Sequence, residues 1–547
     1  MVCGGALVFT ACTDGNDWEA DSSHARLFAI GSSSLKLTTF SDHVIISFDG
    51  YGGEGDYVVE LSQDTLYQQE VATDSRIVYL DGGSEKTIDN LEPETKYFLR
   101  VKKHAEGQND SKWIYYTSST GARSFKTKAE QLFNAVTDAD ILENQITVKW
   151  KSTKNVTRLV VSKGGEKVQD IALTGAEPQD SEGNFIYTIT GLNAGSTYTI
   201  ELYDGDVRRG KLSVKTATAP DTDSYVFTVP AGTSVSNALV KAKAQEALDN
   251  GKNSLTIVLE AGQEYLFGYN DEDGTSGAVL APTATNAEGT EVGMSVTFLG
   301  AGGDRATLTF KKSFDSKGDH TNVVFQHLNL VDDGANYFFN QSEATNVESL
   351  TVEDCEAKDF KNAFFRMQGG NDKVINKLSL INCIFHDMCS GYSFVHVDAS
   401  SGKGVVKNLY MKDCTLYSVA EGGKMFIYSK NTNMESIVIE NMTMNNSIGN
   451  GNFLIDFGST DYGVQNDFLI NNTIFGASAK GAVATKVIRG SKQPICNSTI
   501  FTKDCVWGVG DAYGGKAEDL FKDPENADFT IIDAGVSNMG DSRWFSE

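Results

Sequence analysis

The stretch Val352-Glu353-Asp354-Cys355 returns as Leu380-Ile381-Asn382-Cys383 and again as Met411-Lys412-Asp413-Cys414. Blurred copies precede and follow these three, at a spacing of about thirty residues. Aligning all the copies gives one Asp/Asn column: Asp332, Asp354, Asn382, Asp413, Asn441, Asn471 and Asp504. A period of this length indicates stacked structural repeats in the C-terminal half of the chain.

The repeats have the pattern of short β-strands. Runs such as 377–381 (Lys-Leu-Ser-Leu-Ile) and 436–440 (Ser-Ile-Val-Ile-Glu) are alternating or β-branched, and turns rich in Asn, Asp, Gly and Ser separate them. Helical repeats would need apolar residues at three-and-four spacing, and leucine-rich repeats would need a stricter Leu register. The sequence therefore predicts a coil with two or three short strands per turn, a parallel β-helix.

The repeated cysteines fit the interior of such a coil. We expect them to stack there as small apolar residues, in the column Cys355, Cys383, Cys414 and Cys505, with Met442 and Asn472 between. Zinc sites use close pairs of cysteines, which one Cys per repeat does not provide. The Asp/Asn column is interpreted as a ladder of turn-capping side chains that satisfy backbone N–H groups. Calcium bound at its Asp members is the alternative.

Length and charge narrow the possible partners. The 547 residues are enough for several domains, and 47 Lys and Arg against 73 Asp and Glu give a net charge of −26. Such a surface repels nucleic acid. It also disfavours long-range attraction of a polyanionic glycan, so a ligand of that kind would need a local basic groove.

The N-terminus resembles the end of a bacterial lipoprotein signal. Residues 4–11 are apolar with small side chains, Cys12 follows, and the chain is polar and acidic up to about Ser23. The acidic run after Cys12 is similar to the export tag of outer-surface lipoproteins in the Bacteroidota. The resemblance implies lipidation at Cys12, a tether over residues 1–26, and a place at the outer membrane and cell surface, with membrane attachment only through the lipid. The sequence departs from the pattern, because no basic region precedes the apolar run; a frayed apolar terminus is the alternative.

Two segments with alternating strands follow, at 27–128 and 129–218. The first contains Leu91-Glu-Pro-Glu-Thr-Lys-Tyr97, and the second contains Gly191-Leu-Asn-Ala-Gly-Ser-Thr-Tyr198 after a strand ending in Trp150. Both stretches resemble the corner of fibronectin type III domains, where a Tyr hydroxyl ties a strand to the preceding turn. Neither segment has a catalytic constellation. We interpret them as spacers; binding of a glycan or a protein by their loops is the alternative.

Residues 219–547 are expected to form the β-helix domain. The best helix of the chain spans Ser234 to Asn250, with a polar start, an Ala/Leu/Lys-rich middle and a stop at Asn250-Gly251. A helix followed by a strand, Ala-Gly and Tyr265 resembles the entry of pectate-lyase-like right-handed β-helices, where the helix plugs the open end of the coil. The ending Gly540-Asp-Ser-Arg-Trp544 is similar to that of β-helix lipoproteins of the Bacteroidota. This resemblance implies glycan utilisation, and no specific activity.

A second recurring motif is a triplet whose last residue changes from repeat to repeat. The copies end at Asn340, Arg366, His396, Tyr428, Asp456 and Arg489, and Gln368, Asp398 and Lys430 stand two residues after three of them. The first two residues of each triplet are apolar, which conflicts with simple alternation along a strand. Either a bend precedes the third residue, or a loop covers this face. At about 4.8 Å per coil, five steps would give a row of roughly 24 Å.

Side chains of this kind suit a sugar polymer. Arg and Lys pair with uronate carboxylates, and Tyr and His can lie against sugar rings. We therefore predict that the row binds a polysaccharide, with an acidic, pectin-like glycan favoured, and that the protein works beside outer-membrane glycan importer components. The alternative is that these residues are solvated or mutually paired side chains on one face of the β-helix.

Two other functions stay open. A divergent polysaccharide lyase would use Arg366, His396, Lys430 and Arg489, with one cation acting as the base at a depressed pKa. No paired catalytic carboxylates or Gly-His-Gly motif of known β-helix enzymes is present, so no catalytic residue is assigned and binding is favoured over catalysis. No cofactor is expected apart from possible calcium. A structural or adhesive surface protein is the third reading.

Overall fold

The computed structural model describes residues 27–29, 31, 35–48, 56–66, 70–71, 75–80, 85–118, 121–400, 402–421, 424–449, 453–483 and 487–545. Lipidation at Cys12 and the tether over 1–26 lie outside these residues. Two compact units divide the chain: Met1–Asn134 with Lys149–Ile186 and Tyr198–Ser213, and Ala135–Val148 with Tyr187–Thr197 and Val214–Glu547. This border runs through the second sandwich, so the domain boundaries at 128/129 and 218/219 stay predictions.

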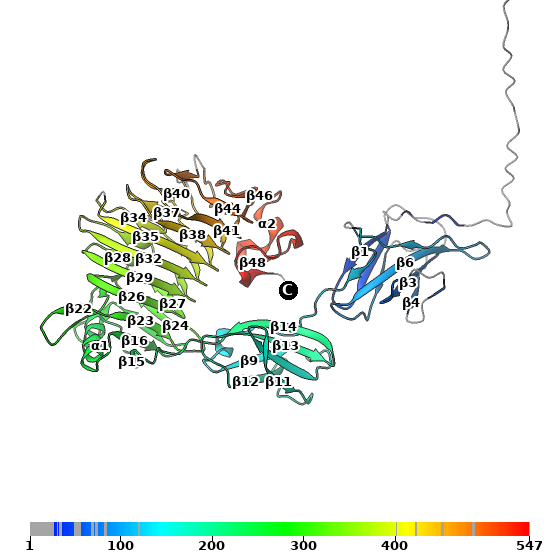
Figure 1. The fold of residues 1–547 in the computed structure, drawn as a ribbon, viewed down its shortest axis with the longest axis horizontal. Coiled ribbons are helices and arrows are strands. Elements are labelled where there is room, and N and C mark those ends of the chain that lie inside the picture. The colour runs from blue at the N-terminus through cyan, green and yellow to red at the C-terminus, as the bar shows by residue number, and fades with distance from the viewer. Residues whose placement is uncertain are drawn as a thin grey trace, which may run out of the picture. The chain divides into compact units, whose positions relative to one another are not determined.

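The first sandwich has two antiparallel sheets (Figure 1). One has the order β1 (Leu35–Thr39), β2 (Val44–Phe48), β5 (Glu85–Ile88). The other has the order β4 (Arg76–Leu80), β3 (Asp56–Ser62), β6 (Lys96–His104), β7 (Ile114–Tyr115), with β8 (Phe125–Lys126) also paired to β6. The Tyr97 hydroxyl accepts a hydrogen bond from the backbone N–H of Glu92 at 3.0 Å. This is the tyrosine corner that the sequence predicted.

The second sandwich repeats the plan. One sheet has the order β11 (Glu166–Ala172), β10 (Arg158–Lys163), β13 (Thr197–Asp204), β14 (Val207–Lys215), and the other pairs β12 (Phe185–Thr190) with β9 (Gln145–Trp150). Phe133 forms a bridge to Trp150, so the chain before β9 adds an edge to that second sheet. Trp150 and Tyr198 are buried. Both N-terminal domains are therefore fibronectin type III-like.

A right-handed parallel β-helix follows, with three sheets running along its length (Figure 1). Sheet 1 consists of β15 (Tyr225–Val229), β16 (Ser254–Leu259), β23 (Ser295–Gly300), β26 (Gly318–Gln326), β29 (Thr345–Glu353), β32 (Lys373–Ile381), β35 (Gly404–Lys412), β38 (Ser436–Glu440), β41 (Phe468–Asn471) and β44 (Ile495–Asn497). Sheet 2 consists of β17 (Glu264–Phe267), β24 (Ala306–Phe310), β27 (Leu328–Asp332), β30 (Glu356–Lys358), β33 (Ile384–Met388), β36 (Thr415–Val419), β39 (Thr443–Asn445), β42 (Ile474–Phe475), β45 (Ile500–Phe501) and β46 (Asp511–Ala512). Sheet 3 consists of β20 (Val279–Leu280), β25 (Phe314–Asp315), β28 (Tyr337–Gln341), β31 (Ala363–Met367), β34 (Val395–Val397), β37 (Ile427–Ser429), β40 (Ile455–Asp456) and β43 (Ile488–Arg489).

The start of the coil is closed by helix α1 (Asn237–Asp249), as predicted. The Ser236 side chain accepts a hydrogen bond from the N–H of Leu239, and Asn250 forms the C-cap. One face of the helix, including Val240 and Ala244, joins the continuous apolar core of the coil. Two hairpins lie in the same early part of the chain: β18 (Tyr269–Asn270) with β19 (Thr275–Ser276), and β21 (Thr283–Thr285) with β22 (Glu291–Gly293).

The corner between sheets 1 and 2 carries the Asp/Asn column, with corrections to its membership. Its residues all have left-handed backbone conformation: His327, Asp354, Asn382, Asp413, Asn441, Asn472 and Ser498. The predicted members Asp332 and Asp504 are wrong, because Asp332 ends β27 and Asp504 follows β45, both strands of sheet 2. The predicted member Asn471 is also wrong, because strand register pairs Glu440 with Asn471 and Asn471 with Asn497, which moves the corner one residue on. Asn and Asp tolerate this conformation better than most residues.

The column is a ladder between side chains rather than a set of caps on backbone N–H groups. Asn441 donates to Asp413 at 2.7 Å, and Asn472 donates to Asn441 at 2.8 Å. Asp332, outside the column, is the residue that acts as a turn cap, since its carboxylate accepts from the N–H groups of Ala335 and Asn336. The ladder ties the corners of successive coils together.

The residue after each corner points into the core. Cys355, Cys383, Cys414 and Met442 are buried there, as expected. The assignment of Asn472 and Cys505 to this column is wrong, because Thr473 and Thr499 occupy the next two positions. Their hydroxyls donate to backbone carbonyls at 2.9 Å, as the thiols of Cys383 and Cys414 do over 3.1–3.5 Å. Cys355, Cys383 and Cys414 are free thiols.

The last residues fold back over sheet 2. Helix α2 (Ala517–Leu520), the hairpin of β47 (Phe521–Asp523) and β48 (Asp528–Ile531), and three 3₁₀ turns, η4 (Pro524–Asn526), η5 (Ala534–Val536) and η6 (Ser542–Trp544), form this cap. Asp541 is buried and accepts from the Thr415 hydroxyl at 2.8 Å. Arg543 donates to Asp541 at 2.7 Å and to Asn382 at 2.9 Å, and Trp544 donates to Thr415 at 2.7 Å. We call residues 540–544 the C-terminal clamp.

Candidate functional site

The predicted row is a single register column of sheet 3. Strand pairing sets Asn340 beside Arg366, Arg366 beside His396, His396 beside Tyr428, Tyr428 beside Asp456, and Asp456 beside Arg489. We call these six residues the sheet 3 row. The structure therefore brings together side chains that are spread over about 150 residues of sequence.

The conflict with strand alternation is resolved by an irregularity at the first residue of the triplet. Leu454 O accepts from the N–H groups of both Phe426 and Ile427, at 2.9 and 3.3 Å. Phe426 lies just before β37, whereas Phe338 and Phe364 lie inside β28 and β31 but are left out of the register that pairs these strands. The rings of Phe338 and Phe364 stack 4.6 Å apart in the core. Regular alternation applies from the second residue of the triplet on, and it points the third outward.

Arg366 and Asp398 form the centre of the row. Arg366 Nε and Nη2 donate to the two carboxylate oxygens of Asp398 at 3.2 and 2.7 Å, and Nη1 donates to the Tyr337 hydroxyl at 2.9 Å. Burial works against the charge of Arg366, but Asp398 outweighs it and raises the Arg366 pKa. Burial also opposes the charge of Asp398, but His396 and Arg366 hold its pKa well below the usual range. The pair is thus a fixed, charge-neutral unit.

Four side-chain rings lie beside the Arg366–Asp398 pair. The Tyr337 and Tyr392 ring centroids are 6.4 Å apart, Tyr392 and His396 are 4.7 Å apart, and His396 and Tyr428 are 5.0 Å apart. The Arg366 guanidinium lies 4.3 Å from the centre of the Tyr392 ring. Tyr392 and Tyr428 are half-exposed, whereas His396 is buried. We call Tyr337, Tyr392, His396 and Tyr428 the ring strip.

A second Arg–Asp pair closes the C-terminal end of the row. Arg489 Nε and Nη2 donate to the two oxygens of Asp456, each at 2.6 Å, and the guanidinium lies 4.6 Å from the Phe453 ring. These hydrogen bonds raise the pKa of Arg489. The Asp456 side chain is 4% exposed and the Arg489 side chain 39% exposed. The arginine therefore supplies most of the polar atoms of this pair that solvent can reach.

The opposite end of the row holds a residue that the sequence did not indicate. Asn340 N–H donates to Asp315 Oδ1 at 3.1 Å, and burial raises the pKa of Asp315 to about 7. Gln368 donates to Asn340 at 2.8 Å, and Lys430 is exposed. Asp315, Tyr337, Tyr392 and Phe453 are the functional candidates that sequence reasoning missed. Only the apolar-then-polar pattern of Phe314-Asp315 could have revealed one of them.

The pKa directions bear on the lyase alternative. A base must be uncharged before it takes a proton. The pKa values of Arg366 and Arg489 are raised, which opposes that role. Burial lowers the pKa of His396, and its Nε2 lies 3.6 Å from Asp398 Oδ2. Among these three residues, His396 alone has a pKa shifted towards the uncharged form that a base needs.

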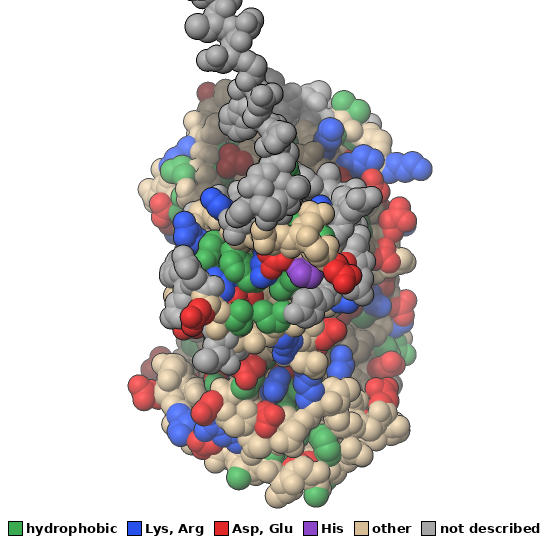
Figure 2. Space-filling model, turned by 90° about the vertical axis from the view of Figure 1, so that its right-hand side faces the viewer, with side chains coloured by type: hydrophobic (Ala, Val, Ile, Leu, Met, Phe, Trp, Pro, Cys, Tyr) green, Lys and Arg blue, Asp and Glu red, His purple; other side chains and the backbone are tan. Residues whose placement is uncertain are grey.

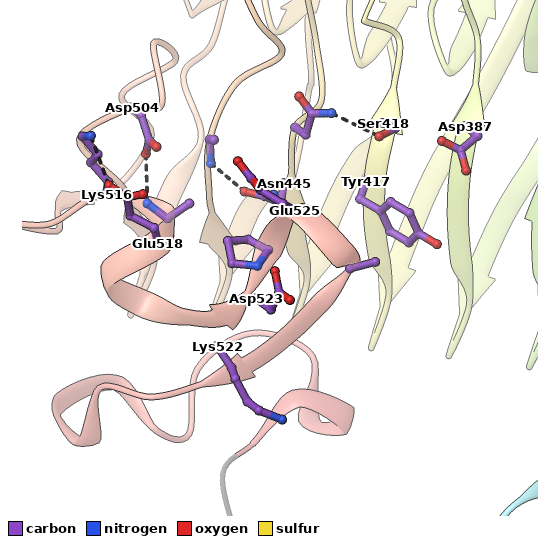
Figure 3. A pocket seen from close by; sticks show the side chains of 15 residues that line it. Asp387, Tyr417, Ser418, Asn445, Asp504, Lys516, Glu518, Lys522, Asp523 and Glu525 are labelled. Atoms are coloured by element: carbon purple, nitrogen blue, oxygen red, sulfur yellow. Dashed lines mark hydrogen bonds and ion pairs between the residues drawn. The ribbon is translucent and has the colours of Figure 1, made fainter.

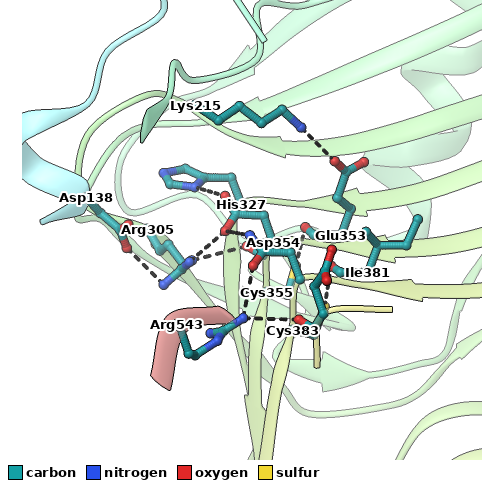
Figure 4. A network of polar contacts seen from close by, with 12 residues as sticks. Asp138, Lys215, Arg305, His327, Glu353, Asp354, Cys355, Ile381, Cys383 and Arg543 are labelled. Carbon is teal, nitrogen blue, oxygen red and sulfur yellow. Dashed lines mark hydrogen bonds and ion pairs between the residues drawn. The ribbon is translucent and has the colours of Figure 1, made fainter. Parts of the chain in front are cut away.

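The corner ladder offers carboxylates for calcium, but two of them already have partners (Figure 4). Asp354 accepts from Arg305 Nη2 at 2.7 Å and lies 2.7 Å from His327 Nδ1, and His327 Nε2 lies 2.8 Å from the Gly303 carbonyl. The Asp413 carboxylate accepts from Asn441 at 2.7 Å, and Arg543 Nη2 donates to the Asp413 backbone carbonyl at 3.3 Å and to the Asn382 side chain at 2.9 Å. In the described ranges no cluster of three or more His, Cys, Asp or Glu is arranged to bind a metal ion.

A cavity of about 770 Å³ lies between sheet 2 and the C-terminal cap (Figure 3). Tyr417 and Asn445 line it from the sheet, and Lys522 and Asp523 line it from the hairpin. The Tyr417 ring stacks on the His386 ring at 4.8 Å and lies 5.5 Å from the Phe529 ring. Its charged side chains also pair within the protein, as Lys522 does with Asp528 at 2.9 Å. The sheet 3 row is therefore the stronger candidate.

The surface charge has a mixed pattern in the view that Figure 2 gives: acidic and basic side chains are interspersed, with hydrophobic side chains between them. No described helix combines the length and the apolar composition needed to cross a bilayer. Neither observation identifies a ligand.

Comparisons with known proteins add little to this picture. Residues 437–544 match a family described as a domain of unknown function, DUF5123, which covers the last coils and the C-terminal clamp. No curated protein matches the chain.

Solved structures similar to the chain include a two-domain fibronectin type III segment of chicken tenascin, at 13% identity and a TM-score of 0.21, over 34% of this chain and 99% of that one. The chicken CNTN1 FN1–FN3 domains match at 12% identity and a TM-score of 0.15, over 36% of this chain and 69% of that one. The scores are too low to support an argument about function.

Proposed function

We propose that the protein is a surface-tethered polysaccharide-binding lipoprotein whose sheet 3 row holds a glycan chain. The ring strip between two fixed Arg–Asp pairs is the observation that supports this function. Tyr rings provide large, rigid, amphipathic contact area against the C–H faces of sugars. Side chains already locked by ion pairs lose little conformational freedom on binding.

The shape of the row also suits a polymer. Its side chains repeat coil by coil along one face, which matches an extended ligand better than a compact one. In this proposal the fibronectin type III-like domains act as spacers and Cys12 carries the lipid, with the protein at the outer membrane beside importer components. The resemblance at the N-terminus motivates this part.

The test is affinity electrophoresis of the full chain carrying Cys12→Ser, in gels that contain single polysaccharides. Retardation in at least one gel is expected, and Tyr392→Ala with Tyr428→Ala should remove it. Tyr410→Ala is the matched control, since Tyr410 is a half-exposed tyrosine on sheet 1. Migration unaffected by every glycan, or loss of retardation in the control alone, would reject the row as a glycan site.

A lipid-labelling experiment tests the anchor separately. Cells that express the full chain should incorporate labelled fatty acid into the protein, and Cys12→Ser should abolish it. Retained label in that variant would place the lipid elsewhere.

An absorbance measurement in solution, made beside the gels, tests the lyase alternative. A rise in ultraviolet absorbance from unsaturated uronates during incubation with a uronate polymer would make the protein a lyase, and His396→Ala should then abolish the rise. Constant absorbance together with retardation supports binding alone.

A further inference from the structure

The two arginines of the sheet 3 row are occupied by carboxylates of the same protein. Arg366 uses Nε, Nη1 and Nη2 in hydrogen bonds to Asp398 and Tyr337. Arg489 uses Nε and Nη2 on Asp456. Proteins bind a uronate carboxylate through the forked donor edge of an arginine. In both arginines the edge formed by Nε and Nη2 already holds an aspartate, and in Arg366 the Nη1 group is also bonded to the Tyr337 hydroxyl.

Neither aspartate can be displaced easily. Asp456 is buried and also accepts a hydrogen bond from the Gly458 N–H at 2.8 Å, so the backbone holds it in place. Asp398 lies between Arg366 and the buried His396, with its backbone N–H bonded to the Met367 carbonyl at 3.0 Å. A ligand carboxylate would meet these fixed negative charges beside each arginine, and like charges at short range repel.

The remaining groups suit a ligand without charge. The Asp398 carboxylate is partly exposed and keeps lone pairs that can accept from sugar hydroxyls, and the guanidinium of Arg489 keeps N–H groups that can donate to them. Gln368 and Asn340, which are hydrogen-bonded to each other, add an amide edge of the same dual character. Lys430 is exposed and offers a single hydrated point charge, which is a weaker carboxylate ligand than a forked arginine.

We propose that the sheet 3 row selects neutral polysaccharide segments and excludes uronate-rich ones, with Asp398 and Asp456 as the residues that set this specificity. This inference rests on the proposed function, and it reverses the preference for an acidic glycan that the sequence suggested. The net charge of −26 acts in the same direction on a polyanion at long range.

The experiment uses the full chain with Cys12→Ser in affinity gels that contain mixed-linkage β-glucan, xyloglucan or galactomannan as neutral probes, and polygalacturonate or alginate as uronate probes. Wild type should be retarded by at least one neutral probe and by neither uronate probe. Asp398→Asn should bind a uronate probe at least about tenfold more strongly than wild type, because the freed Arg366 can pair with it. This gain should fade at high salt.

Asp372→Asn is the matched control, since Asp372 loses the same charge from an exposed ion pair with Lys403 on the same β-helix. It should leave every migration unchanged. Asp456→Asn is the second variant and should produce the same gain through Arg489 if Asp398→Asn does not fold, which a thermal melt will show.

The outcomes separate the two claims. Retardation of wild type by a uronate probe, with or without the neutral ones, overturns the neutral preference and leaves polysaccharide binding in place. Failure of a folded Asp398→Asn to gain uronate binding also overturns it. Wild type that no probe retards overturns the proposed function itself.

Discussion

Arg489 donates two hydrogen bonds of 2.6 Å to Asp456 on the neighbouring strand of sheet 3, and the two side chains differ strongly in solvent exposure. The aspartate side chain is 4% exposed and the arginine side chain 39% exposed. Removal of either partner should therefore have unequal consequences. A buried carboxylate without its charged partner costs more stability than a partly exposed guanidinium without its carboxylate.

Arg489→Ala should lower the free energy of unfolding by about 1–3 kcal/mol, because a buried carboxylate loses its charged partner. Asp456→Asn should cost less, since the neutral amide keeps an acceptor for Arg489 and for Gly458. Chemical denaturation followed by circular dichroism gives both values. Lys403→Ala removes an exposed pair and should change stability by less than about 0.5 kcal/mol; an equal loss in both alanine variants would contradict the argument.

Stability should fall as pH rises from about 4 to about 7 because of Asp315. Its pKa is raised from 3.8 to about 7 by burial, so the folded state holds a proton that the unfolded state releases. That stabilisation is complete below pH 3.8 and is lost as pH rises to about 7. One pKa unit is worth about 1.4 kcal/mol, so the shift corresponds to roughly 4 kcal/mol.

Thermal melts from pH 4 to pH 8 should show this decline, and Asp315→Asn should flatten it. The raised pKa values of His327 and His386 act with the same sign, because their carboxylate partners favour the protonated form, so some slope will remain. A profile unchanged by Asp315→Asn would show that Asp315 does not titrate differently in the two states.

The C-terminal clamp should stabilise the coils that it contacts. Arg543 joins the buried Asp541 to the corner residue Asn382, and Arg543→Ala removes both contacts. We expect a loss of about 1–3 kcal/mol, seen as faster hydrogen exchange in residues 380–445 with unchanged exchange in the fibronectin type III-like domains. Lys516→Ala, in an exposed pair with Glu518, is the control. Uniform acceleration over the whole chain would argue against a local role.

The cysteines of the coil should differ in reactivity towards a thiol reagent. Burial raises the pKa of Cys355, Cys389 and Cys414, which keeps them protonated and out of reach. Cys496 is only partly buried and should react first. Peptide mapping after native labelling will show the order, and labelling in denaturant provides the total. Early modification of Cys414 would mean that the corner column opens in the native state.

The repeated sequence motif was sufficient to predict the β-helix, because residues at equivalent positions recur in successive coils. The sheet 3 row was predicted with every residue in register, since apolar pairs such as Phe364-Phe365 mark the same place in each coil. The predicted membership of the corner column was wrong at both ends of the column. Asn471-Asn472 gives two equivalent choices by sequence, and His327 carries no Asp/Asn signature.

The ion pairs could not be read from the sequence for a different reason. Arg366 and Asp398 come from different coils, and their bond depends on side-chain direction rather than on position in the repeat. Tyr337 and Tyr392 lie outside the triplets, so no pattern linked them to His396. Hence the sequence indicated which face to examine, and the structure supplied the ion pairs on which the proposal of a neutral glycan rests.

The C-terminal clamp has a consequence for how the chain is made. Residues 541–544 bond to Asn382 and Thr415, which leave the ribosome more than a hundred residues earlier. Coils can stack on their predecessors during synthesis, as repeats that contact only their neighbours do. The corner ladder nevertheless lacks these partners until residues 541–544 have been synthesised. Translation that stops before residue 540 would therefore release a β-helix whose coils are stacked but lack the contacts of the C-terminal clamp. We expect proteases to degrade such a product faster than the full chain.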